Sequence, residues 1–117
     1  MKFTPIDPPR KFCVGGGGAI TLKDCGRLEL QPDEQVTFVT ETGAEYDVTR
    51  KTWGFYATPS MNGRLVRFGL RAVLVKSSDG KLFVMLVERG KEPEFERYLA
   101  REGQIVVQWF DSGTLEP

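Results

Sequence analysis

The sequence predicts a mainly β protein: an antiparallel β-sandwich or barrel-like sheet of about eight strands with one C-terminal helix, and an α+β arrangement as the alternative. Three observations support this prediction. Hydrophobic residues make up 40% of the 117 residues, as in a folded domain. Runs rich in β-branched and aromatic residues alternate with short turns between residues 19 and 87. One amphipathic segment with helix start and stop signals follows them.

Residues 1–18 are predicted to form a flexible arm ahead of a single β-rich domain at residues 19–117. Pro5, Pro8 and Pro9 precede four consecutive glycines, so we expect no continuous strand or helix there. The glycines lack the Gly-Lys-Ser/Thr ending of a phosphate-binding loop and lead into a strand pattern. They are therefore interpreted as a connector.

Two three-residue loops that end in glycine predict hairpins, because glycine adopts the left-handed conformation that such loops require. They are Asp24–Gly26 and Glu41–Gly43. The first would place Leu22 opposite Leu28, and the second would place Phe38 opposite Tyr46. Both arrangements pair apolar side chains across neighbouring strands.

A third hairpin is predicted between the strand at residues 65–76 and the strand at residues 81–88. A two-residue turn at Asp79-Gly80 would place Arg71 opposite Glu88 and make an ion pair. A three-residue loop is the alternative and shifts the register by one. Both faces are apolar near the turn, so we expect this hairpin to be covered on both sides.

One helix is predicted after this hairpin. Pro93 suits the first helical turn, and Phe95, Tyr98 and Leu99 form a single apolar stripe. Gly103 supplies the stop. A last strand is expected at residues 104–110, followed by a polar tail.

Composition and charge exclude several classes of function. The chain has no histidine, which removes His-based triads and the His-containing zinc sites. Sixteen basic and sixteen acidic residues cancel, which argues against nucleic-acid binding through bulk charge. Signatures of dinucleotide binding and of a serine nucleophile are missing. We expect no cofactor and no metal site.

The cysteines and the N-terminus favour a soluble, cytoplasmic protein with no membrane partner. Residues 1–10 contain no apolar core of signal-peptide length. Cys13 and Cys25 are twelve residues apart, unlike a Cys-x-x-Cys pair. We interpret them as separate thiols, with a disulfide or a reactive Cys25 as the alternatives.

The candidate ligand-binding residues lie between residues 53 and 67, where an aromatic cluster precedes a polar turn and a basic strand. They are Trp53, Tyr56, Asn62, Arg64 and Arg67. An exposed aromatic ring would stack on a sugar or base while the amide and guanidinium groups donate hydrogen bonds. The simpler interpretation places Trp53 and Phe55 in the core, and neutralises the arginines with Glu88 or the acidic helix.

The segments at residues 53–65 (WGFYATPSMNGRL) and 83–92 (FVMLVERGKE) carry a family resemblance. The chain resembles small bacterial proteins found near methyltransferase or surface-polysaccharide genes. No activity is assigned to that family, so the resemblance implies no catalytic residue. It implies an accessory role in a bacterial cytoplasm.

These observations lead to three hypotheses about function. The favoured one is a non-catalytic binding or accessory module for an unknown protein or small molecule, with a sugar-containing ligand or a partner enzyme as examples. A small histidine-free enzyme that uses a carboxylate or Cys25 is the second. A self-associating protein is the third, pairing through a sheet edge or a face bearing Trp109 and Phe110 as a homodimer.

Overall fold

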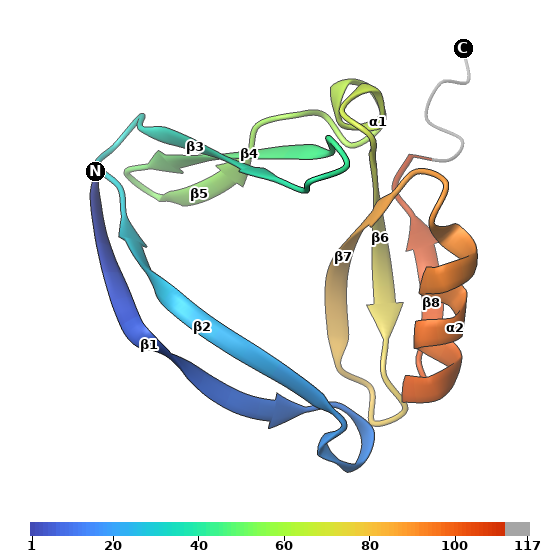
Figure 1. Cartoon of the computed structure of the whole chain (residues 1–117). Helices are drawn as coiled ribbons and strands as arrows, with labels where there is room; N and C mark the ends of the chain where they lie inside the picture. The colour runs from blue at the N-terminus through green and yellow to red at the C-terminus, as the bar shows by residue number, and fades with distance from the viewer. Residues whose placement is uncertain (112–117) are drawn as a thin grey trace. The chain divides into compact units, whose positions relative to one another are not determined.

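The computed structural model describes residues 1–111 and is mainly β (Figure 1). Its strands are Lys2–Val14 (β1), Ile20–Glu29 (β2), Gln35–Val39 (β3), Glu45–Lys51 (β4), Gly54–Ala57 (β5), Leu70–Lys76 (β6), Leu82–Glu88 (β7) and Ile105–Trp109 (β8). Its helical segments are Gly16–Gly18 (η1, a 3₁₀ turn), Arg64–Arg67 (α1) and Glu92–Glu102 (α2). The predicted fold class, with about eight strands and a C-terminal helix, is confirmed.

The described strands form three antiparallel sheets, ordered β1-β2, β3-β4-β5 and β7-β6-β8, and they do not close into a barrel. Contacts divide the chain into two compact units. The first unit is Met1–Gln35 with Thr49–Tyr56, and the second is Val36–Val48 with Ala57–Pro117. The boundary predicted after residue 18 lies inside the first unit. Except for Asp111, the predicted polar tail lies outside the described residues.

The N-terminal segment is a strand, so the prediction of a flexible arm is wrong for residues 2–14. β1 pairs with β2 along its length, with a register shift between Pro5 and Arg10. Pro8 and Pro9 fall inside that shift, where the chain needs no ladder hydrogen bond from them. In a two-stranded ribbon every strand is an edge, so a proline can face away from the partner. The glycines of η1 connect the two strands, as predicted.

The hairpin predicted at Asp24–Gly26 is not formed, because β2 runs straight through it. Leu28 faces Phe3 instead of Leu22, and Leu22 faces Phe12. Gly26 has a different reason to be glycine. A Cβ there would lie 2.6 Å from the Phe3 ring and 2.9 Å from the carbonyl oxygen of Thr4. The close approach of β1, not a turn, requires the missing side chain.

The hairpin predicted at Glu41–Gly43 is confirmed. The Thr40 amide donates to the Ala44 carbonyl at 3.0 Å, and Gly43 has a φ of 98°. Thr37 donates to Asp47 at 2.6 Å across β3 and β4, a spacing that also places Phe38 opposite Tyr46.

The third hairpin forms with the alternative register. Its loop has three residues, closed by the Ser77 amide on the Lys81 carbonyl at 2.8 Å, so Arg71 faces Val87 and Leu70 faces Glu88. Gly80 takes the left-handed position with a φ of 87°. The Ser77 hydroxyl accepts the Lys81 amide at 3.0 Å, a contact that stabilises this loop.

The strand predicted from residue 65 begins only at Leu70. Residues 64–67 form the short helix α1, and Gly69 turns the chain with a φ of 90° before β6 starts. The helix buries Leu65 almost completely. Arg67 therefore lies on α1 and Arg71 on β6, although one strand had been predicted to contain both.

The sheet β7-β6-β8 has a core on each of its faces. On one face, Val73, Val75 and Val87 pack against Leu99 of α2, with Phe95, Tyr98 and Trp109 around them. On the other face lie Ala44, Leu65, Leu70 and Ala72, with Tyr46, Leu86 and Phe110 packed against them. Trp109 and Phe110 are thus half-buried and pack against different cores, so they do not form one exposed face.

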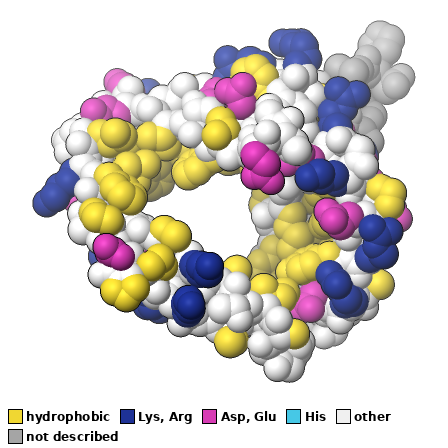
Figure 2. Space-filling model, in the orientation of Figure 1, with side chains coloured by type: hydrophobic (Ala, Val, Ile, Leu, Met, Phe, Trp, Pro, Cys, Tyr) yellow, Lys and Arg dark blue, Asp and Glu magenta, His cyan; other side chains and the backbone are white. Residues whose placement is uncertain are grey.

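The predicted cover on both sides of the β6–β7 hairpin is incomplete. Near the turn, Leu82 is 59% exposed and Val84 is 65% exposed, and hydrophobic side chains reach the surface in both units (Figure 2).

The helix α2 follows the prediction: it spans Glu92–Glu102 and ends at Gly103, which has a φ of 66°. β8 confirms the last predicted strand, with a bulge opposite Leu74 and Val75.

Candidate functional site

The two aromatic residues of the predicted ligand site lie in the first unit. Trp53 occupies the turn between β4 and β5 and is 71% exposed, and Phe55 of β5 is 59% exposed. The interpretation that Trp53 and Phe55 fill the core is therefore wrong. The Trp53 and Tyr56 ring centroids are 6.5 Å apart and their planes are tilted by 34°. The two rings form an exposed pair of the kind that can stack on a ligand.

The three polar residues of that predicted site lie in the second unit. Asn62 is exposed in the turn before α1, and α1 carries both arginines. The guanidinium of Arg64 lies 5.3 Å from the centre of the Phe68 ring, and Arg67 is exposed. The predicted five-residue site draws on both units and stays a prediction.

Arg71, the arginine of β6, has a structural role. It donates to both carboxylate oxygens of Asp111, at 2.7 and 3.2 Å, and to Glu92 at 3.3 Å. Its guanidinium stacks 4.0 Å from the centre of the Trp109 ring. The hydrogen bonds to Asp111 are the main reason that the Arg71 pKa is raised. Asp111 and Glu92 of α2 therefore neutralise Arg71, and Glu88 does not.

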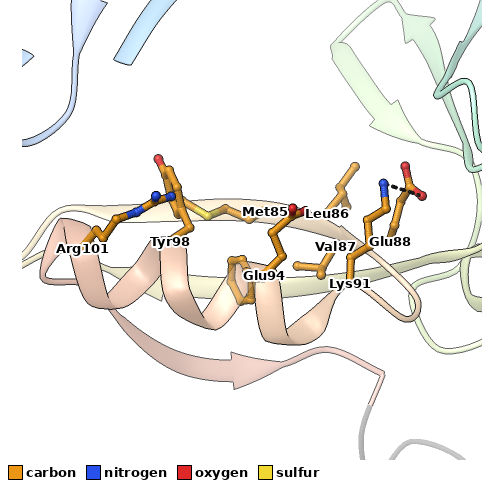
Figure 3. A pocket seen from close by; sticks show the side chains of 9 residues that line it. Met85, Leu86, Val87, Glu88, Lys91, Glu94, Tyr98 and Arg101 are labelled. Atoms are coloured by element: carbon orange, nitrogen blue, oxygen red, sulfur yellow. Dashed lines mark ion pairs between the residues drawn. The ribbon is translucent and has the colours of Figure 1, made fainter. Parts of the chain in front are cut away.

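The second unit also contains a groove of about 510 Å³ between β7 and α2, which the sequence did not predict (Figure 3). The groove is lined on one side by four residues of β7. On the other side it is lined by four residues of α2 and by the residue that precedes the helix. They are Met85, Leu86, Val87 and Glu88, and Lys91, Glu94, Phe95, Tyr98 and Arg101. This volume falls within the range of ligand-binding clefts.

The floor of the groove is apolar. Val87 is buried, and Met85, Phe95 and Tyr98 are half-buried beside it. The apolar stripe of α2 thus serves two purposes, because Leu99 reaches the core while the Phe95 and Tyr98 rings also border the groove. The sequence predicted the apolar stripe, but it did not predict how far the stripe lies from β7.

Charged side chains form the rim. Glu88 and Lys91 pair at 3.7 Å at one end (Figure 3). Among the described residues, Glu94 and Arg101 have no ion-pair partner, and they lie seven residues apart on α2. Seven helical residues span about 10.5 Å. The rim therefore presents one free acid and one free base at separate points.

Glu88 is held as a carboxylate. Thr42 donates to it at 2.6 Å, and this hydrogen bond is the main reason that the Glu88 pKa is lowered, with Thr40 adding to the effect. A carboxylate with a lowered pKa is ionised near neutral pH. It would act as a fixed negative charge and not as a general acid.

Within residues 1–111, the edge of β7 that borders the groove is unpaired, because β7 ends the sheet. Its hydrogen-bonding pattern follows from the two ends of the β6–β7 ladder, where Ser77 bonds Lys81 and Arg89 bonds Gly69. Residues of an antiparallel pair alternate between bonding inward and pointing outward. The outward residues of β7 are therefore Leu82, Val84, Leu86 and Glu88, and the Glu88 carbonyl already accepts the Lys91 amide at 3.0 Å.

The cysteines do not extend the candidate site. Both are exposed free thiols in the first unit. Cys13 faces Thr21 across the ribbon, and Cys25 lies four residues farther along β2. Four strand residues span about 13 Å, well beyond the reach of a disulfide.

Residues 1–111 show neither a metal-binding cluster nor a membrane-spanning helix. No three acidic or sulfur side chains come close enough there to hold a metal ion. Within the same residues, no helix combines the length and apolar character needed to cross a bilayer.

No family model, curated protein or solved structure matches the chain. The resemblance drawn from residues 53–65 and 83–92 therefore stays an expectation.

Proposed function

We propose that the protein is a binding module that takes up an extended segment of a partner protein as an additional strand beside β7. The observation that carries this proposal is the coincidence of an unpaired strand edge with an adjoining apolar groove. Strand addition is a general mode of peptide recognition in which backbone hydrogen bonds supply affinity and side-chain pockets supply specificity.

The edge supplies the backbone part. Leu82, Val84 and Leu86 each present an outward N–H and C=O in the described part of the sheet. An antiparallel or parallel segment can bond to these groups without disturbing the β6–β7 ladder. Near the turn the segment would also cover the exposed Leu82 and Val84 side chains.

The groove supplies the side-chain part. Phe83, Met85 and Val87 point to the α2 face of the sheet, because Val73 and Val75 face Met85 and Phe83 from β6. Alternate side chains of an added segment would enter the groove against Phe95 and Tyr98. Apolar residues would be favoured at those positions.

The rim charges set the polarity of the segment. Arg101 would attract an acidic residue or a terminal carboxylate, and Glu94 would attract a basic one. An extended chain rises about 3.4 Å per residue, so these two charges would lie about three residues apart. β7 itself contains no basic residue, so β7 of a second copy would not complement Glu94. The charges therefore favour a foreign segment over a second copy.

The test is a selection of peptides from a random 12-residue library displayed on phage, with the wild-type protein as bait. We expect the selected peptides to share alternating apolar residues and an acid–base pair about three residues apart. Val84→Pro removes an outward N–H without removing a β6 hydrogen bond. We expect this change to weaken binding of a selected peptide at least about tenfold, measured by fluorescence anisotropy.

Ser78→Pro is the matched control, since it places a proline in the loop of the same hairpin at a position that accepts it. Its peptide affinity should equal that of the wild type. Arg101→Glu should weaken the same peptide and be rescued when the peptide's acid is changed to lysine. Unchanged binding by Val84→Pro would overturn the proposal. Failure to select any peptide, with Val84→Pro abolishing self-association instead, would assign the edge to a second copy.

A further inference from the structure

The first unit contains a second hollow, of about 500 Å³, at the end of the β1–β2 ribbon that includes Lys2 and Glu29. Every residue that lines it belongs to the first unit. They are Lys2, Thr4, Arg27, Leu28, Glu29, Leu30, Arg50 and Phe55. The proposed binding of a protein segment at β7 does not involve this hollow.

The strand register brings its polar side chains onto one face. Lys2 lies opposite Glu29 and Thr4 lies opposite Arg27, so the four side chains share a face of the ribbon. Their proximity follows from pairing residues that are more than twenty positions apart in the sequence. The sequence prediction of an arm at residues 1–18 did not include this pairing and so did not predict the hollow.

The lining is basic. It holds three cationic side chains, Lys2, Arg27 and Arg50, and one carboxylate. None of the three cations has an ion-pair partner among residues 1–111. The three cations outnumber the single carboxylate, Glu29, and such an excess of positive charge is unfavourable unless a ligand or solvent ions neutralise it.

The acids that follow β2 are already engaged by other cations. Glu34 binds the N-terminal amino group at 3.0 Å, and Asp33 binds Lys51 at 2.5 Å. The Gln31 amide and the N-terminal amino group hold the Glu34 pKa below its ordinary value. These acids are therefore not free to neutralise Lys2, Arg27 or Arg50.

Two further features define the ligand. The Arg50 guanidinium donates to the Lys51 carbonyl, which fixes its position at the wall. Phe55 is 59% exposed and offers an aromatic face for stacking, and the Thr4 hydroxyl adds a hydrogen-bonding group. Guanidinium groups bind phosphate oxygens through paired hydrogen bonds, and an aromatic face stacks on a planar ring.

We propose that this hollow binds a phosphate group attached to a ring, as in a nucleoside monophosphate or a sugar phosphate. Lys2, Arg27 and Arg50 would hold the phosphate and Phe55 would contact the ring. The volume suits a ligand of that size and greatly exceeds what a free phosphate ion requires.

The experiment is isothermal titration calorimetry of the full chain with four probes: uridine 5′-monophosphate, ribose 5-phosphate, inorganic phosphate and uridine. We expect the two organic phosphates to bind, and phosphate alone and uridine alone to bind at least about tenfold more weakly. Stronger binding of uridine 5′-monophosphate would assign the ring to a base, and stronger binding of ribose 5-phosphate would assign it to a sugar.

Arg27→Gln should weaken the preferred organic phosphate by about tenfold or more, because a charge-assisted hydrogen bond is lost. Lys23→Gln is the matched control, since it removes the same charge from the same strand outside the hollow, and it should leave the affinity unchanged. Phe55→Leu should weaken the organic phosphate but not inorganic phosphate. Arg27 is exposed, so Arg27→Gln should melt like the wild type.

The proposal would be overturned if neither organic phosphate produced binding heat at millimolar concentration. Equal losses in Arg27→Gln and Lys23→Gln would also overturn it, because they would indicate attraction by overall charge. Neither result bears on peptide binding at β7, which is tested with different variants.

Discussion

The two units of this molecule are stabilised in different ways. Nine hydrophobic residues are buried among residues 1–111; eight of them belong to the second unit, and Leu30 is the ninth. The first unit consists largely of a long ribbon and short strands, and its described ion pairs lie at the surface. The second unit has a three-stranded sheet with a core on each face. Backbone pairing can thus define a local structure where little apolar surface is buried.

This difference predicts that the units respond unequally to mutation and denaturant. Each unit contains one tryptophan, Trp53 in the first and Trp109 in the second. Trp53 is largely exposed, so Trp53→Phe should leave the fold intact and make Trp109 fluorescence a reporter of the second unit alone.

The largest effect is expected from Leu65→Ala. Leu65 is 1% exposed in the core of the second unit, and its truncation should lower the free energy of unfolding by about 2–5 kcal/mol. The measurement is urea denaturation followed by Trp109 fluorescence in the Trp53→Phe background. Leu30→Ala, the corresponding change in the first unit, should cost about 1–2 kcal/mol in urea denaturation followed by circular dichroism, because the surrounding ribbon can relax. Equal costs would contradict the contrast between the units.

A smaller effect is expected from Arg71→Lys in the second unit. Lysine cannot keep both hydrogen bonds to Asp111 or the stacking on Trp109, and we expect a loss of about 1–3 kcal/mol. Thermal denaturation checks it. Arg97→Lys, on the exposed side of α2, should change stability by less than about 0.5 kcal/mol. Similar losses in both variants would show that the network around Arg71 does not stabilise the second unit.

The smallest effect concerns pH. The pKa of Glu88 is lowered in the folded state, so its contribution to stability is present above the ordinary value of 4.5 and is lost as the pH falls through the lowered pKa. Thr42→Ala removes the main hydrogen bond that lowers this pKa. We expect a weaker loss of stability on acidification and an upward shift of the Glu88 pKa in an NMR titration.

Thr52→Ala, an exposed threonine in a turn of the first unit, is the control for that titration and should leave the Glu88 pKa unchanged. A Glu88 pKa that does not respond to Thr42→Ala would show that the Thr42 hydroxyl does not set it.

Where the sequence predicted the fold correctly, the signals were local. The Glu41–Gly43 loop combines a left-handed glycine with matched apolar neighbours, and α2 combines Pro93, an apolar stripe and Gly103. Each of these features is decided within about ten residues. Neither depends on which distant strand becomes the neighbour.

The incorrect predictions concerned pairing between segments that are far apart in the sequence. Leu28 had two suitable apolar partners, Leu22 through a hairpin and Phe3 through the ribbon, and only the fold of β1 decides between them. The register of the β6–β7 hairpin was predicted from an Arg71–Glu88 ion pair. Asp111 and Glu92 satisfy Arg71 instead, and both lie more than twenty residues from it in the sequence. A charged side chain with several possible partners is a poor guide to register.

The candidate sites, too, were predictable from sequence only where they depend on local signals and not on distant pairing. The residues of the β7–α2 groove were visible as a strand and a helical stripe, but a groove is the space left between two packed elements. The basic hollow required β1 to be recognised as a strand. The aromatic cluster at Trp53 was found from sequence because it is contiguous, and the structure places it at the surface.

The bulge in β8 has a consequence for how far the sheet β7-β6-β8 can grow. A bulged edge strand pairs poorly with another chain, and this irregularity lies on the side of the sheet opposite β7. Extension is thereby directed to one side, and one incoming strand at β7 would complete a four-stranded sheet. Such an arrangement favours a discrete complex with fixed stoichiometry over an open-ended fibre.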